Sequence, residues 1–332
     1  MIFKFNLLTY KHMSIYQSTP PTLWSGRKAE SLQYWHQAVR CLDSLDLPGE
    51  STDKKLAILG YAGEEGVKRN QGRIGTAQGP KAIRKMMGPM AYHLPKALKI
   101  YDLGDVLTEG DGMEASHDLI YQTIKGLLSN KAFPVILGGG HDLAYPHGKA
   151  VMEHCLSKGE KLGIINLDAH FDIRPKVDGK GHSGSPFLEL ATSFPKNFEY
   201  LCLGIQSAAN PPELFEKANQ LHVQWMEMEE FTMDNWPQIK DHLDTFCQSI
   251  NKIYLSIDLD GFSSAVAPGV SAPSPWGFSP ELIAKVLEWI AQSGKLISLD
   301  VVELNPEYDQ DNSTSKLAAR CIEYTLRKLL IG

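Results

Sequence analysis

The segment that most constrains the fold of this chain runs Gly163-Ile-Ile-Asn-Leu-Asp-Ala-His-Phe-Asp-Ile-Arg174. Asp168, His170 and Asp172 are spaced two residues apart and follow an apolar run of strand length. Side chains alternate in direction along extended backbone, so an extended segment would aim all three toward the same side. The segment therefore predicts three potential metal ligands that converge at the end of one strand.

Two other segments repeat this pattern. The apolar run Ile253–Asp260 ends with Asp258 and Asp260, again two residues apart. The run Phe133–Asp142 ends in three glycines followed by His141. Open parallel sheets place ligands at the carboxyl ends of their strands, so we expect the three segments to meet.

The combined ligand set indicates a two-metal centre. Four carboxylates and two neutral imidazoles in one place would carry a charge of about −4, which an apolar interior tolerates only with cations. Oxygen-rich ligation with imidazole and no thiolate favours two Mn²⁺ ions, with Zn²⁺, Co²⁺ or Fe²⁺ as alternatives and Mg²⁺ less suited. One such motif alone more often marks a helix cap or a tight turn. The predicted metal ligands are His141, Asp168, His170, Asp172, Asp258 and Asp260.

Strand and helix patterns alternate along most of the 332 residues, which predicts an α/β fold with a mainly parallel sheet covered on both faces, in three layers. Eight apolar runs are typical of strands: 56–60, 99–103, 134–137, 162–167, 200–204, 222–226, 253–257 and 296–301. Helices are predicted at 79–87, 112–128, 145–157, 211–219, 234–250, 280–292 and 315–330.

The N-terminal region differs from this alternation. Apolar residues recur at helical spacing between Glu30 and Leu45. We therefore expect residues 1–50 to form an extension with one helix packed on the outside, and residues 51–332 to form a single catalytic domain. Residues 261–277 follow Asp260 directly and are rich in proline and serine, which favours an active-site loop over an ordinary crossover.

The net charge, the cysteines and the lengths of the apolar runs limit the classes of partner and the cell compartments that fit this chain. The net charge of −6 is mild and no basic block stands out, so we expect a small-molecule substrate and no nucleic acid or membrane partner. The five cysteines contain no Cys-x-x-Cys motif, and no run has the length of a membrane span or the form of a leader. We therefore expect a cytoplasmic protein.

Two metals that share a bridging water would hold it as hydroxide for attack on an electrophilic carbon or phosphorus, so the predicted reaction is hydrolysis. A P-loop, a dinucleotide fingerprint and a nucleophile elbow are all absent from the sequence. Asp172 is the candidate for orienting the hydroxide. Glu303, which follows another apolar run, would complete the metal shell or bind a cationic amidine or guanidine group.

Several polar residues could bind the rest of the substrate. Arg174 lies two residues after Asp172 and could hold a substrate carboxylate bidentately, or else pair with a neighbouring aspartate. The loop after the first strand carries charged residues that could meet a second carboxylate or simply face solvent. His182 could act as a proton shuttle or be merely exposed. The predicted substrate-binding residues are Arg69, Asn70, Arg73, Arg174, His182 and Ser183.

These segments resemble the ureohydrolase family, which includes arginases, agmatinases and formimidoylglutamases. The Gly-Gly-Gly-His141, Asp168-Ala-His170-Phe-Asp172, Asp258-Leu-Asp260 and Asp300-Val-Val-Glu303 segments are similar to the family's metal and amidine-binding motifs in order and spacing. The resemblance implies an arginase-like fold with an eight-stranded sheet, two Mn²⁺ ions and a homo-oligomer.

Within the family, residues 63–75, 169–174, 182–187 and 200–205 are most similar to the formimidoylglutamase branch. This resemblance implies cleavage of N-formimidoyl-L-glutamate to L-glutamate and formamide. A substrate with two carboxylates also agrees with Arg174. Ser183 stands where arginases and agmatinases carry a histidine, so the general acid stays unassigned. The alternatives are a ureohydrolase that releases urea and a catalytically silent relative.

Overall fold

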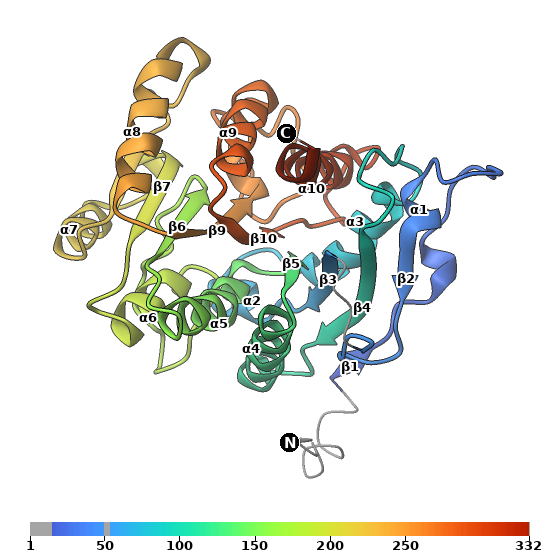
Figure 1. Ribbon diagram of the computed structural model, residues 1–332. Coiled ribbons are helices and arrows are strands. Elements are labelled where there is room, and N and C mark those ends of the chain that lie inside the picture. The colour runs from blue at the N-terminus through green and yellow to red at the C-terminus, as the bar shows by residue number, and fades with distance from the viewer. Residues whose placement is uncertain (1–14, 50–53, 332) are drawn as a thin grey trace.

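The computed structural model describes residues 15–49 and 54–331, which build one ten-stranded sheet with helices on both faces (Figure 1). The strand order is β1-β4-β3-β5-β10-β9-β6-β7-β8, with β2 also paired to β4, and every pair is parallel except β1 with β4. The strands are β1 (Tyr16–Gln17), β2 (Val39–Cys41), β3 (Lys55–Ala62), β4 (Lys99–Leu107), β5 (Ala132–Leu137), β6 (Leu162–Leu167), β7 (Tyr200–Ile205), β8 (Gln224–Glu227), β9 (Lys252–Asp258) and β10 (Leu296–Val302).

The α/β fold predicted from the sequence is confirmed, and the eight predicted strands correspond to β3 to β10. Central strands such as β6 and β7 are buried at every position, as expected for a parallel sheet covered on both sides. Alternate residues of β3 enter two separate cores: Ile58 packs on one face, whereas Leu59 packs on the other.

The helices divide between the two faces (Figure 1). Those that pack on the face of Ile58 are α3 (Gly79–Met87), α8 (Trp236–Gln248), α9 (Pro280–Gln292) and α10 (Ser313–Ile331). Those that pack on the face of Leu59 are α4 (Met113–Ser129), α5 (Ala144–Leu156), α6 (Pro186–Ser193) and α7 (Pro212–Gln220). Two further helices are short: α1 (Trp35–Ala38), whose Trp35 packs into the core on the face of Ile58, and α2 (Glu65–Arg69). Helices α2 and α6 fall outside the predicted helices. None of the helices in the described ranges is long and apolar enough to cross a membrane.

The predicted helix between Glu30 and Leu45 is wrong. Only Trp35–Ala38 is helical, and the next residues form β2, which pairs in parallel with β4 from Val39 opposite Ile100. The backbone of β2 obtains its hydrogen bonds from the open edge of β4, which a sequence pattern does not reveal. Residues 15–49 thereby add β1 and β2 to the eight predicted strands.

The strand order explains how the site is assembled. Strands β5, β10, β9 and β6 are neighbours in the sheet, and all four run in the same direction. The residues that follow their carboxyl ends include His141, Glu303, Asp260 and Asp168. Segments that lie more than 100 residues apart in the sequence therefore reach one point at one edge of the sheet.

A buried ion-pair network joins helix α3 to strand β4. The Arg84 guanidinium is fully buried, donates two hydrogen bonds to Asp102, and donates a third, of 2.5 Å, to Asp105. Trp24 of the N-terminal segment donates to the same Asp102 carboxylate at 2.6 Å. Removing one partner of such a network leaves an uncompensated charge in the interior, which is strongly destabilising.

We expect Arg84→Met to lower the free energy of unfolding by about 3–5 kcal/mol, because Asp102 would stay buried without its cation. Urea denaturation followed by circular dichroism measures this loss. Lys85→Met, on the exposed side of the same helix, is the matched control and should change stability by less than about 0.5 kcal/mol. Equal effects of the two substitutions would contradict the proposed importance of the network.

Candidate metal centre

The six predicted ligands lie together in two groups that share Asp168. The first group is His141, Asp168, Asp172 and Asp258, and the second is Asp168, His170 and Asp260, with the ligand atoms of each group within 4.8 Å of one another. His141 Nδ1 lies 2.8 Å from Asp172 Oδ2 and 2.9 Å from Asp258 Oδ2. Asp168 directs Oδ2 toward His141 and Oδ1 toward His170, each at 3.3 Å. Asp168 thus contributes one carboxylate oxygen to each of the two groups.

Turns, rather than extended backbone, bring these side chains together. Strand β6 ends at Leu167, and the carboxylate of Asp168 then accepts a hydrogen bond from the His170 amide at 2.7 Å. Asp258 accepts one from the Asp260 amide at 2.8 Å in the same way. The expectation of an extended Asp-x-His-x-Asp segment is therefore wrong in its local detail, because each first aspartate caps a tight turn.

Two residues of the site have left-handed backbone, which is uncommon for residues other than glycine. Asp172 has φ of 49° and Glu303 has φ of 65°. Such conformations cost about 1–3 kcal/mol each and persist only where the surrounding structure enforces them. The strain falls on the two residues that the sequence analysis named as catalytic.

The electrostatics of the site favour a divalent cation. Burial raises the pKa of Asp258 well above its usual range, and the charges of Asp260 and Asp168 raise it further. Burial alone would lower the pKa of His141, but the three aspartates close to its Nδ1 atom raise it well above the usual value instead. His141 Nδ1 and Asp260 Oδ1 are buried without a well-aligned hydrogen-bond partner. These orphaned atoms and the excess of carboxylates fit a pair of metal ions.

A second layer of hydrogen bonds fixes His141. Its Nε2 atom lies 2.9 Å from Ser256 Oγ, which donates to Asp300 Oδ1 at 2.6 Å. Asp300 also accepts from Tyr254 and bonds His147 Nδ1 at 2.6 Å. This chain holds the imidazole so that Nδ1 faces the aspartates, as is typical of metal-binding histidines. The sequence analysis missed Ser256, which alternation from Asp258 along β9 could have indicated.

Glu303 follows β10 and closes the site from another side. Its Oε1 atom accepts a hydrogen bond of 2.8 Å from the backbone amide of His141. Burial, followed by the charge of Asp260, raises the pKa of Glu303 to about 8. The carboxylate is therefore tied to the first metal ligand and has an interior environment suited to a cationic group.

A cavity of about 490 Å³ opens over the two ligand groups. Of the predicted residues outside the metal set, Asn70, Arg73, Arg174, Ser183 and Glu303 line it. The cavity also contains residues that the sequence analysis did not single out, namely Val67, Gln71, Gly72, Ser271 and Ala272. Two of these belong to the 261–277 loop that was predicted to border the active site.

Arg174 has an uncommitted guanidinium. Within the described residues, no hydrogen bond or ion pair involves its side chain, so the alternative of a pair with a neighbouring aspartate is not what the structure has. Nearby, Asn70 donates a hydrogen bond of 3.1 Å to Ser183 Oγ. A charged donor without a partner at a cavity wall is well placed to receive an anion.

Arg69 does not line the cavity, contrary to prediction. Its guanidinium bonds Glu65 and Glu114, the latter at 2.6 Å, and also donates to the carbonyls of Asp111 and Gly181. The carboxylates of Glu65 and Glu114 offset the positive charge of Arg69. Arg69 therefore joins α2 to α4 rather than binding substrate.

His182 is also placed differently from the prediction. The ring is buried, with Nε2 at 3.0 Å from the Pro175 carbonyl and Nδ1 accepting from the Gly184 amide. Both nitrogens are thus engaged in holding a loop, which leaves the ring no free position for proton shuttling.

Arg73 lines the cavity, but its guanidinium donates to the carbonyls of Ser271 and Val270.

The pKa of Glu303, raised from 4.5 to about 8, makes the stability of the metal-free protein depend on pH. The folded state retains a proton there that the unfolded chain releases, so stability is present at low pH and falls between about pH 4.5 and pH 8. The raised pKa values of Asp258 and His141 act in the same direction. We expect the melting temperature of EDTA-treated protein to fall across this range.

Mn²⁺ should reverse this loss, because it replaces protons as the compensating charge. At a concentration 100 times its dissociation constant, one bound ion adds about 2.7 kcal/mol of stability. Differential scanning fluorimetry with and without Mn²⁺ should show a stabilisation that grows with pH in the wild type and shrinks in Asp258→Asn. A stabilisation of equal size in both proteins would contradict the assigned ligands.

Comparison with known proteins agrees with this architecture. Residues 54–327 match the model of the arginase family. The chain is 39% identical to the formimidoylglutamase of Ralstonia nicotianae, over 91% of this chain and 94% of that protein. It is 37% identical to the one from Aeromonas salmonicida, over 96% and 98%.

Solved structures show the same fold. Formimidoylglutamase from Bacillus subtilis superposes with a TM-score of 0.81 over 93% of this chain and 95% of that chain, at 24% identity. The formiminoglutamase of Trypanosoma cruzi with Mn²⁺ gives 0.76 at 26% identity, over 86% and 97%. The family match covers residues 54–327, and the two relatives at 39% and 37% identity are aligned over more than nine-tenths of each chain. The chain therefore belongs to the arginase family.

Proposed function

We propose that this chain hydrolyses N-formimidoyl-L-glutamate to L-glutamate and formamide. The observation that carries the proposal is the unpaired Arg174 guanidinium at the wall of the cavity above the two ligand groups. A cationic wall attracts a substrate with two carboxylates and repels an amine such as agmatine. The relatives that are 39% and 37% identical bear the name formimidoylglutamase.

The proposed ligands would hold two Mn²⁺ ions, with His141, Asp168, Asp172 and Asp258 around one ion and Asp168, His170 and Asp260 around the other. Such a pair of ions supplies an activated water for attack on an electrophilic carbon.

The protein's own groups would position the substrate. Glu303 would accept hydrogen bonds from the formimidoyl nitrogen, since a carboxylate fixed by the His141 amide matches a cationic amidine. Arg174 would hold one substrate carboxylate, and Asn70 with Ser183 would offer hydrogen bonds beside it. Asp172, held in left-handed backbone, would orient the water toward the formimidoyl carbon.

Purified Mn²⁺-loaded protein should release formamide and glutamate from N-formimidoyl-L-glutamate. Arginine, agmatine and 4-guanidinobutyrate, assayed in parallel for urea, should react at least about 100-fold more slowly, as expected when a charged contact is missing. Urea release from a guanidino compound as the fastest reaction would replace this function with another ureohydrolase activity. Cytoplasmic location and homo-oligomeric assembly stay predictions.

Arg174→Ala should raise KM for N-formimidoyl-L-glutamate about 10-fold to 100-fold, because a charged hydrogen bond contributes about 1.5–3 kcal/mol. Turnover at saturation should change little, since the carboxylate lies away from the reacting carbon. Steady-state kinetics measures both constants. Arg320→Ala, an exposed arginine of α10, is the matched control, and an equal effect in both variants would rule out the contact.

Asp172→Asn should reduce kcat at least about 1,000-fold and should also lower the amount of Mn²⁺ bound per chain. Both losses are expected because Asp172 would serve as a metal ligand and would also orient the water. Metal content is measured by atomic absorption after gel filtration. Asp178→Asn, an exposed aspartate that also has left-handed backbone, controls for the loss of a charge from such a position. Full metal content with normal turnover in Asp172→Asn would remove this residue from the site.

A further inference from the structure

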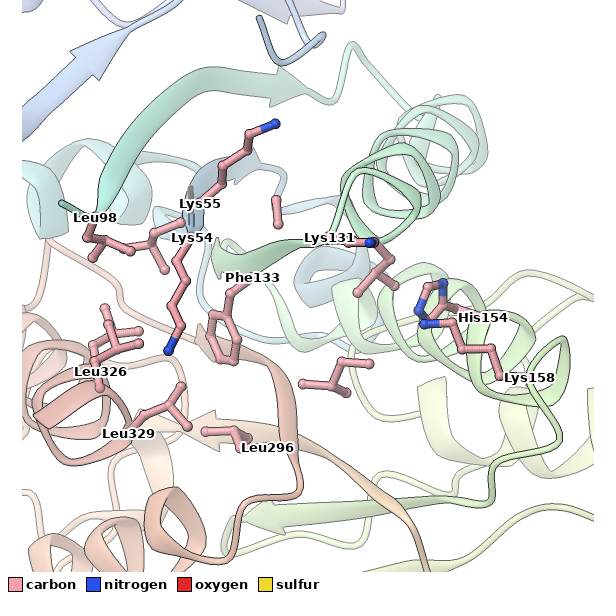
Figure 2. A pocket seen from close by; sticks show the side chains of 15 residues that line it. Lys54, Lys55, Leu98, Lys131, Phe133, His154, Lys158, Leu296, Leu326 and Leu329 are labelled. Atoms are coloured by element: carbon pink, nitrogen blue, oxygen red, sulfur yellow. The ribbon is translucent and has the colours of Figure 1, made fainter. Parts of the chain in front are cut away.

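A second cavity, of about 360 Å³, lies at the edge of the sheet opposite the metal centre. It is formed where strands β3, β5 and β10 begin and where helices α4, α5 and α10 end. We call it the basal groove; Figure 2 shows its side chains, and its lining residues are 54–56, 98, 128, 131–133, 154, 158, 296, 297, 326, 329 and 330. Nothing in the proposed reaction uses this groove.

The basal groove combines an apolar floor with a cationic rim. Phe133 and leucines from β10 and α10 supply the floor (Figure 2). The rim carries Lys54, Lys131 and Lys158, and none of the lining residues is acidic. The buried Lys55 also contributes to the lining, but its amine points away from the leucines and Phe133 (Figure 2). Three lysines around one groove contrast with the net charge of −6 of the whole chain.

The amines of the groove differ in whether a described residue pairs with them. Lys55 donates to the carbonyl of Gly49 at 3.3 Å. For Lys54, Lys131 and Lys158, no ion pair or hydrogen bond of the amine occurs within residues 15–49 and 54–331. Burial lowers the pKa of His154 on the same wall, and the charge of Lys158 lowers it further. Glu160, which pairs with Lys252, acts on His154 in the opposite direction. Among the described residues, the lining of the groove itself therefore carries positive charge and no negative charge.

The helix ends do not account for so much positive charge. Each helix C-terminus is equivalent to about −0.5 charge, so three helices supply about −1.5 against three lysines. Backbone and amide groups also satisfy the last carbonyls: Asn130 donates to Gly126 at 2.9 Å, and the Lys158 amide donates to Cys155 at 2.9 Å. The lysine amines are therefore not needed as caps.

We propose that the basal groove binds a small amphipathic carboxylate, with an alkyl or aryl body on the Phe133 floor and the carboxylate at the lysine rim. The volume suits a single small molecule. A purely apolar partner would leave the lysines unexplained, and a nucleic acid would leave the apolar floor unexplained. The site is distinct from the metal centre because it lies at the amino ends of the strands.

Calorimetric titration of the Mn²⁺-loaded full-length protein with octanoate tests the proposal. Saturable binding is expected, whereas 1-octanol, which lacks the charge, and acetate, which lacks the chain, should each bind at least about tenfold more weakly. Equal affinity for octanoate and 1-octanol would overturn the proposal, as would the absence of saturable octanoate binding.

Charge reversal locates the site. Lys54→Glu/Lys158→Glu should weaken octanoate binding at least about tenfold, while hydrolysis at the metal centre stays at the wild-type rate and shows that the variant is folded. Lys81→Glu/Lys196→Glu makes the same charge change at exposed positions outside the groove and should bind octanoate normally. Unchanged binding in the groove variant would contradict the proposal.

Sedimentation velocity separates this site from a contact between two copies of the chain. The sedimentation coefficient should be the same with and without octanoate and in the groove variant. If Lys54→Glu/Lys158→Glu dissociated an oligomer, the groove would be an interface between copies, and the proposal of a small-molecule site would fail.

Discussion

The mutual repulsion of four buried aspartates is the constraint on which the rest of this structure depends. Asp168, Asp172, Asp258 and Asp260 stand within a few ångströms of two imidazoles, in an interior that penalises each negative charge. Such a group is stable only if protons or cations compensate it. The raised pKa of Asp258 corresponds to compensation by protons, and the arrangement of the two groups that share Asp168 fits compensation by cations.

The parallel sheet makes this cluster possible, because it gathers the ends of β5, β10, β9 and β6 at one edge. The interior behind them holds the cluster in shape through Ser256 and Asp300, which orient His141. Strain is tolerated in the same place, since Asp172 and Glu303 keep left-handed backbone. The core thus stabilises an arrangement that the site residues alone would not adopt.

The two edges of the sheet differ in character. The carboxyl edge gathers aspartates, whereas the amino edge gathers the lysines of the basal groove. Arg69 and Arg174 show that the neighbours of an arginine decide whether its charge is available to a ligand. Arg69 is neutralised by Glu65 and Glu114, whereas the Arg174 side chain, at the cavity wall, has no ion-pair partner among the described residues. Only the second can contribute its charge to a ligand.

The sequence by itself determined the α/β class, the eight main strands and the six side chains that meet at one edge of the sheet, because strand periodicity and residue spacing are local properties. It could not decide the fate of Val39–Cys41, whose hydrogen bonds depend on the distant edge of β4. Nor could it show that Arg69 is paired with Glu114 while Arg174 stays available at the cavity wall. It also could not show that both nitrogens of His182 have hydrogen-bond partners. Tertiary structure decided these points, because the partners that satisfy a charge or a hydrogen bond come from other parts of the chain.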